Sequence, residues 1–107
     1  MTIASAGYRG TDFKGVTLAA SGPIVAAVPG KRIRVFAYIV SSLLATQIKF
    51  QSNATDISLT MSLADKGGMV VPNAELAWFL TNPGEPLNLN MSVATTVGIQ
   101  VIYDIVE

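Results

Sequence analysis

Hydrophobic and polar residues alternate with a period of two along most of the chain. The segment ISLTMSLA, residues 57–64, has an apolar side chain at every second position, and LNLNMS, residues 87–92, repeats the pattern. Such alternation places one face of a β-strand against a core and the other toward solvent or a partner. No segment keeps apolar residues at the i, i+3, i+4, i+7 spacing of a helix, so we expect an all-β protein with little or no helix.

Turn signals separate the alternating runs. VPGK at 28–31 and NPGE at 82–85 each place Pro and then Gly at the centre of a four-residue turn. Proline presets φ near −65° and glycine accepts positive φ, which are the requirements of a type II turn. The strands between such turns are expected at 14–20, 23–28, 31–42, 45–52, 57–64, 68–72, 76–81, 86–92 and 96–106.

This spacing predicts a single antiparallel β-sandwich domain of about eight strands over residues 14–107. Counting strands does not separate a jelly roll from an immunoglobulin-like sandwich, but the Cys…Trp…Cys signature of the latter is absent because the chain has no cysteine. Residues 1–13 have weak periodicity and are predicted to form a short N-terminal arm. The predicted core consists of Ile33, Val35, Ile48, Phe50, Leu59, Met61, Trp78, Leu87, Leu89, Ile99 and Val101.

Composition removes most catalytic chemistry. The 107 residues include no cysteine and no histidine, which excludes disulfides, thiolate chemistry, His-based triads and the usual zinc sites. The seven carboxylates are scattered without metal-ligand spacing. A pair of them meeting in space as in a glycosidase stays open as an alternative. We therefore expect no enzyme, no catalytic residues, no metal and no cofactor.

Low charge points to association with protein. Formal net charge is zero and 13% of the residues are charged, against about 25% in a typical soluble domain. A monomer with so few surface charges is poorly protected against association, so we expect a homo-oligomer. No apolar run is long enough to span a membrane, and MTIASAGYRG lacks the features of a secretory signal. We therefore expect neither a transmembrane segment nor a secretory signal.

The stretch GKRIRVFAYIVSS, residues 30–42, holds three of the seven basic residues. Period-two alternation predicts that one face of this strand presents Arg32, Arg34, Phe36 and Tyr38. Guanidinium groups beside aromatic rings suit a nucleic acid, but a neutral chain lacks the basic field that captures one. Arginine and aromatic residues are also enriched at protein interfaces. We therefore interpret these four residues as a protein-contact site, with no nucleic-acid partner.

Trp78 is the second candidate binding residue. An exposed tryptophan can stack on a sugar ring, which would suit a carbohydrate-binding module. Its alternation with Leu76 and Leu80 favours a position in the core instead.

Several of these segments resemble small proteins and domains encoded by tailed bacteriophages and prophages. The shared features are the GKRIRV strand, a KFQS strand, the Gly-rich loop before a proline in SLADKGGMVVP, and the G-E-x-L-N-L pattern within WFLTNPGEPLNLNMS. The resemblance covers residues 28–106. It implies a capsid decoration (cement) protein with a jelly-roll-like β-sandwich, bound through the major capsid protein to the outside of the head.

The same resemblance implies that the protein resides on the virion surface, after assembly in the host cytoplasm. Among oligomers a trimer is favoured and a dimer is the alternative. Head-fibre and tail-associated structural roles are the neighbouring possibilities, and the family has no catalytic residues to transfer.

Overall fold

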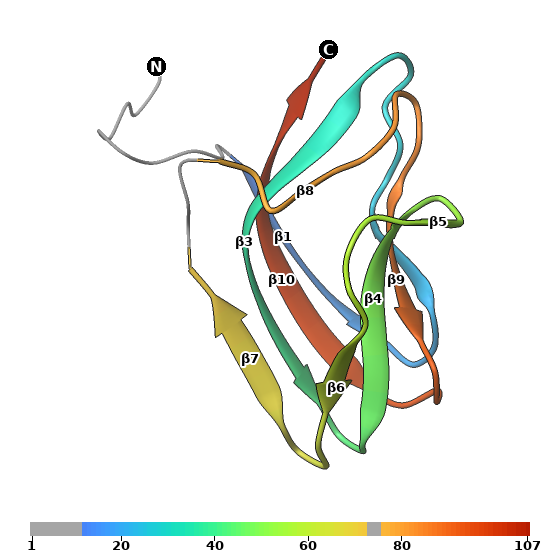
Figure 1. Ribbon diagram of the computed structural model, residues 1–107, viewed down its shortest axis with the longest axis vertical. Helices are drawn as coiled ribbons and strands as arrows, with labels where there is room; N and C mark the ends of the chain where they lie inside the picture. The colour runs from blue at the N-terminus through green and yellow to red at the C-terminus, as the bar shows by residue number, and fades with distance from the viewer. Residues whose placement is uncertain (1–11, 73–75) are drawn as a thin grey trace.

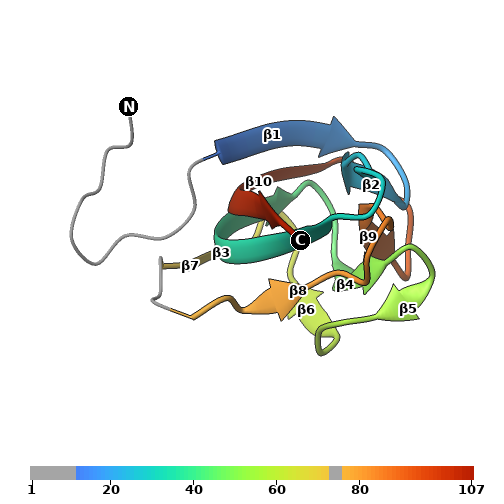
Figure 2. The ribbon, with the colours of Figure 1, turned by 90° about the horizontal axis from the view of Figure 1, so that it is seen from above.

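A computed structural model describes residues 12–72 and 76–107, and it contains two antiparallel sheets packed face to face (Figures 1 and 2). The β10 sheet has the order β1 (Asp12–Leu18), β10 (Val97–Val106), β3 (Arg32–Ser42), β7 (Gly68–Val71), with β8 (Phe79–Leu80) also paired to β3. The β9 sheet has the order β2 (Gly22–Val25), β9 (Leu87–Met91), β4 (Thr46–Ser52), β5 (Thr55–Asp56), with β6 (Met61–Leu63) also paired to β4. No helix occurs among the described residues.

The strand pairs are nested, and this nesting identifies the fold. β1 pairs with β10, β2 with β9, β3 with β7 and β4 with β6, all antiparallel. The chain thus behaves as one long hairpin whose successive strand pairs, from β1–β10 to β4–β6, lie alternately in the two sheets, which is jelly-roll connectivity. The predicted all-β, jelly-roll-like sandwich is confirmed. Residues 1–11 of the predicted arm lie outside the described residues, and its last two residues, Asp12 and Phe13, belong to β1.

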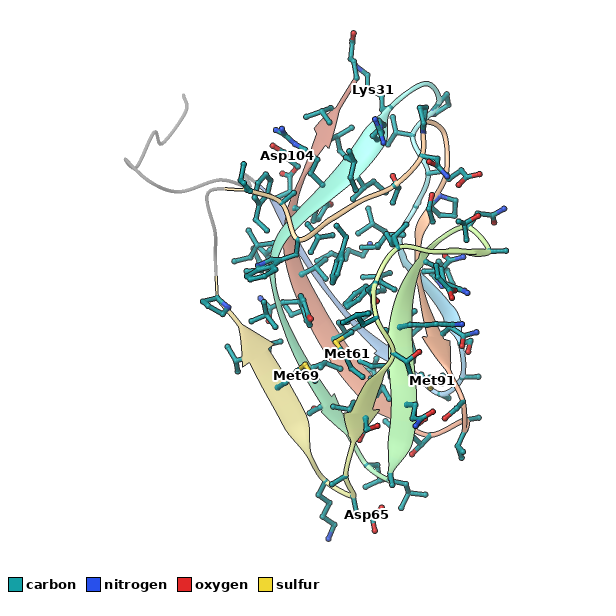
Figure 3. All side chains as sticks on the ribbon, viewed as in Figure 1. Lys31, Met61, Asp65, Met69, Met91 and Asp104 are labelled. Atoms are coloured by element: carbon teal, nitrogen blue, oxygen red, sulfur yellow. The ribbon has the colours of Figure 1, made fainter. Side chains whose placement is uncertain are left out.

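The core lies between the two sheets. Three aromatic rings form its centre: Tyr38 from β3 and Phe79 from β8 each pack on Phe50 from β4, with ring centroids 4.9 Å and 4.6 Å apart. Met61 from β6 and Met69 from β7 point into the space between the sheets (Figure 3). Of the predicted core residues, Met61 is partly buried against the core, and these are fully buried: Ile33, Val35, Ile48, Phe50, Leu87, Leu89, Ile99 and Val101.

Two core predictions are wrong, and each failure has a local cause. The expected strand 57–64 is interrupted, because the Phe50 amide donates to the Ser58 hydroxyl (2.8 Å) where a ladder carbonyl would stand. Leu59 then turns outward and is 84% exposed. In the other segment Phe79 occupies the core, so the neighbouring Trp78 faces out and is 49% exposed.

Both predicted Pro-Gly turns are confirmed. Gly30 and Gly84 have φ of 71° and 74°, and hydrogen bonds close the turns from Lys31 N to Val28 O and from Glu85 N to Asn82 O. The two turns also contact each other, since the Gly84 amide donates to the Lys31 carbonyl (2.8 Å). Lys31 lies at one end of the long axis of the molecule, and Asp65 lies at the other (Figure 3).

Candidate functional site

The four predicted contact residues do not share one face of a strand. Ala37 pairs with Ile102 and Val35 pairs with Tyr103, so Phe36 is an extra residue that forms a β-bulge. The bulge reverses the alternation of β3: Val35 before it and Tyr38 after it are both buried between the sheets. The face predicted for Arg32, Arg34, Phe36 and Tyr38 is therefore wrong.

Tyr38 and Phe36 are both buried, but on opposite sides of the sheet. The Tyr38 hydroxyl donates to the sulfur of Met61 (3.3 Å), and burial raises the pKa of Tyr38. Phe36 is 2% exposed yet lies outside the main core cluster. The guanidinium carbon of Arg34 stands 5.3 Å from the centroid of the Phe36 ring, a cation–π distance. Neither ring presents a free surface to a partner.

The three cations of the basic cluster all have acceptors within the chain. Arg34 makes two bonds to the Asp104 carboxylate (2.8 and 2.7 Å), and these bonds raise the pKa of Arg34. Lys31 Nζ lies 2.8 Å from a carboxylate oxygen of Glu107. Arg32 Nε donates to the Thr81 carbonyl (2.8 Å). A phosphate would compete with these acceptors, so this arrangement favours a structural role over nucleic-acid capture.

The outer face of the β10 sheet carries a continuous uncharged surface, here called the apolar sheet face. Its side chains point away from the core because their strand neighbours Val97, Ile99 and Val101 point into it. Backbone pairing sets them in three rows across the strands: Phe13, Ile102, Ala37; then Gly15, Gln100, Ile39, Val70; then Thr17, Gly98, Ser41, Gly68. Phe13, Ile39 and Val70 are 70%, 51% and 68% exposed.

The third row contains only small residues and is hollowed. A shallow depression of about 340 Å³ runs over Gly15, Ser41 and Gly98. A neighbouring depression of about 440 Å³ continues it to Leu43 and Thr96 at the end of the sheet. Such open hollows suit the side chains of another protein better than an enclosed small molecule.

The apolar sheet face offers little chemistry. Gln100 supplies its amide, and Thr17 and Ser41 supply hydroxyl groups. None of these is a general base at neutral pH. Within 12–72 and 76–107, no group of three or more acidic, histidine or cysteine side chains comes together as a metal site. The same residues include no helix long and apolar enough to cross a membrane.

Two further groups of exposed apolar residues lie outside this face. Leu43 and Leu44 follow β3, and Val93 follows β9, each 51–55% exposed; we call these three residues the apolar end. Trp78 and Leu76 precede β8. The indole nitrogen of Trp78 donates to the Pro72 carbonyl (3.1 Å), and Pro72 lines a hollow of about 210 Å³ beside Val70. Trp78 therefore stands near the border of the apolar sheet face.

The outer face of the β9 sheet is polar, in contrast. Gln47, Lys49 and Gln51 alternate with buried residues of β4, and Asn88 and Asn90 do so in β9. Lys49 and Gln51 both donate to the Asp56 carboxylate (3.0 and 2.8 Å), and these bonds lower the pKa of Asp56. Its polar and charged side chains are typical of a sheet face in contact with solvent.

The sequence held a signal for the apolar sheet face that the prediction did not use. The positions alternating with the core in 37–41 and 98–102 carry Ala, Ile, Ser, Gly and Gln, whereas those in 47–51 carry Gln and Lys. Pairing between segments some sixty residues apart was needed to unite them into one surface.

Comparison with known proteins adds no relative. No protein-family model matches the chain, and neither the curated proteins nor the solved structures yield a match.

Proposed function

We propose that this protein is a non-enzymatic structural protein of a tailed-phage virion, a decoration protein that binds the major capsid protein on the outside of the head. The observation that carries the proposal is exposed apolar surface on a tightly packed sandwich, present both at the apolar sheet face and at the apolar end of Leu43, Leu44 and Val93. Exposed apolar surfaces on soluble proteins mark sites for other proteins. We assign the protein to a tailed-phage virion because its strand and turn motifs resemble those of phage-encoded proteins.

Such a protein stabilises a shell by mass action. It binds the assembled lattice and not the free subunits, so its binding free energy is added to the stability of the lattice. A homo-oligomer gains further affinity because several weak contacts act together. The sandwich needs no cofactor or metal for this role, and its rigidity keeps the ordering cost of binding low.

Particle composition tests the proposal. Virions and empty precursor shells from an induced culture are purified separately, and the protein is quantified in each. We expect many copies per mature head and few per precursor shell, and we expect purified protein to bind expanded heads and raise their disruption temperature. Its absence from purified virions would refute the proposal. Copies confined to one vertex or to the tail in labelled electron micrographs would identify a head-fibre or tail protein instead.

One observation favours a second candidate, a carbohydrate-binding module. Trp78 is half exposed rather than buried in the core, and exposed tryptophan rings stack on sugars. Trp78 is the only tryptophan of the chain, so its fluorescence reports this site alone. A saturable change on titration with host cell-wall glycans, lost in Trp78→Ala, would support this candidate, and an unchanged spectrum would reject it.

A further inference from the structure

We infer that the apolar sheet face docks a second copy of this chain, with the two β10 sheets stacked face to face about a twofold axis. The axis would lie across the strands at the middle row, so that strands of the two copies run antiparallel. This inference concerns the isolated protein and does not depend on any role in a virion. It also selects a twofold pair over the trimer favoured by the sequence.

Charge is the first argument. A twofold contact brings a surface against itself, so a charged side chain near the axis meets its own like charge. The three rows of the apolar sheet face contain no charged residue. The same docking of the β9 sheet would place Lys49 at the centre, within reach of a second Lys49. Of the two outer faces, only the apolar sheet face is compatible with contact between identical surfaces.

Side-chain size is the second argument. Rotation about the middle row exchanges the two outer rows, so the bulky first row of one copy covers the small third row of the other. Phe13 and Ile102 would thus stand over Thr17 and Gly98, where the hollow of about 340 Å³ lies. Large residues facing small ones let stacked sheets interdigitate at about 10 Å separation.

Buried area is the third argument. Four strands spaced about 4.8 Å apart, and about five residues along each, give a face of roughly 25 Å by 25 Å with its side-chain margins. That is about 600 Å² per copy, near the roughly 800 Å² per partner of a standard interface. The area lies near the lower end of the range for specific protein–protein interfaces, which is large enough for a dimer.

The middle row gives the sharpest test. Ile39 would face Ile39 of the second copy near the axis, and it is 51% exposed in the single chain. Sedimentation equilibrium on the full chain from about 1 to 500 µM should give a dimer mass at the upper end. Ile39→Lys and Ile39→Glu should each weaken the dimer by about a hundredfold, because each buries a pair of like charges. Gln47→Lys, which introduces the same charge at an exposed position of the β9 sheet, should leave it unchanged.

Mixing the two Ile39 variants separates a direct contact from loss of folding. Equimolar Ile39→Lys and Ile39→Glu should restore a dimer, now a heterodimer, because opposite charges then meet across the axis. Far-ultraviolet circular dichroism must show both variants folded. A monomer mass at every concentration overturns the inference, as does a wild-type oligomer that survives either substitution. Failure of the mixture to associate would also overturn it, since position 39 would then not face itself. None of these outcomes bears on whether the protein occurs in virions.

Discussion

The two outer faces of this sandwich obey the same alternation and differ in chemistry. Both cover strands whose inner residues are tightly buried, so the fold makes the same demand on each. At the outward-facing positions of the β9 sheet the residues are Gln, Asn and Lys, as is usual for a solvated antiparallel sheet. The outward-facing positions of the apolar sheet face instead include Phe13, Ile39 and Val70, with glycines between them. Since folding does not require an apolar outer face, the difference points to a partner.

The largest expected effect lies beneath the polar face. Leu89 is 1% exposed and faces the core from β9. Leu89→Ala should lower the free energy of unfolding by about 2–5 kcal/mol, through lost burial and a residual cavity. Urea denaturation measures it. Asn90→Ala, on the outer side of the same strand, is the matched control and should change stability by about 0.5 kcal/mol or less. Similar losses for the two variants would show that the inner and outer sides are misassigned.

A pair of glycines on the apolar sheet face gives the next effect. A Cβ at Gly68 would collide with the Val40 carbonyl oxygen where β7 pairs with β3. Gly68→Ala should therefore cost about 1–3 kcal/mol, as forced overpacking does. At Gly15 the nearest atoms to an added Cβ are 4.0 Å away, so Gly15→Ala should be neutral or slightly stabilising. Thermal unfolding of both variants measures the contrast, and equal melting temperatures would contradict it.

The ion pair that borders the apolar sheet face should contribute a smaller amount. Arg34 and Asp104 form a bidentate pair in which the Asp104 side chain is 18% exposed. A double-mutant cycle with Arg34→Met and Asp104→Asn should give a coupling of about 1 kcal/mol, reduced by solvent screening. The Lys49–Asp56 pair on the polar face is a single contact to a carboxylate side chain that is 53% exposed, and it should couple more weakly. A stronger coupling there would reverse the comparison.

The smallest effect is a pH dependence on the polar face. Bonds from Gln51 and Lys49 lower the pKa of Asp56 below its unfolded value. The ionised carboxylate therefore stabilises the fold at neutral pH, and this contribution disappears as the pH falls below about 4. Asp56→Asn should show a shallower loss of melting temperature between pH 6 and 3 than the wild type. Parallel curves would mean that the bonds to Asp56 do not persist in solution.

Local patterns were sufficient to predict the class of fold. Alternation and the turns at Gly30 and Gly84 identified the long strands, because both features depend on neighbouring residues alone. The interruption at Ser58 was not predictable in this way. It depends on a hydrogen bond between a hydroxyl group and the amide of Phe50, a residue of a different strand.

The candidate site was harder to predict for a similar reason. One extra residue at Phe36 moved Tyr38 from the expected contact face into the core, because a one-residue shift exchanges the two sides of a strand. A bulge is visible only against the partner strand. The apolar sheet face likewise combines β1, β10, β3 and β7, and no single segment reveals it.

The nested pairing also restricts when each strand can find its partner during synthesis. β10 lies between β1 and β3, so β1 has no neighbour in its sheet until residues 97–106 have left the ribosome. Until then the apolar residues of β1 stay accessible to chaperones, and β1 pairs only after residues 97–106 have been synthesised. Pairings such as Asp12 with Tyr103 also make folding slow, on the order of milliseconds to seconds. A ribosome stalled before residue 97 would therefore hold a chain without its central strand.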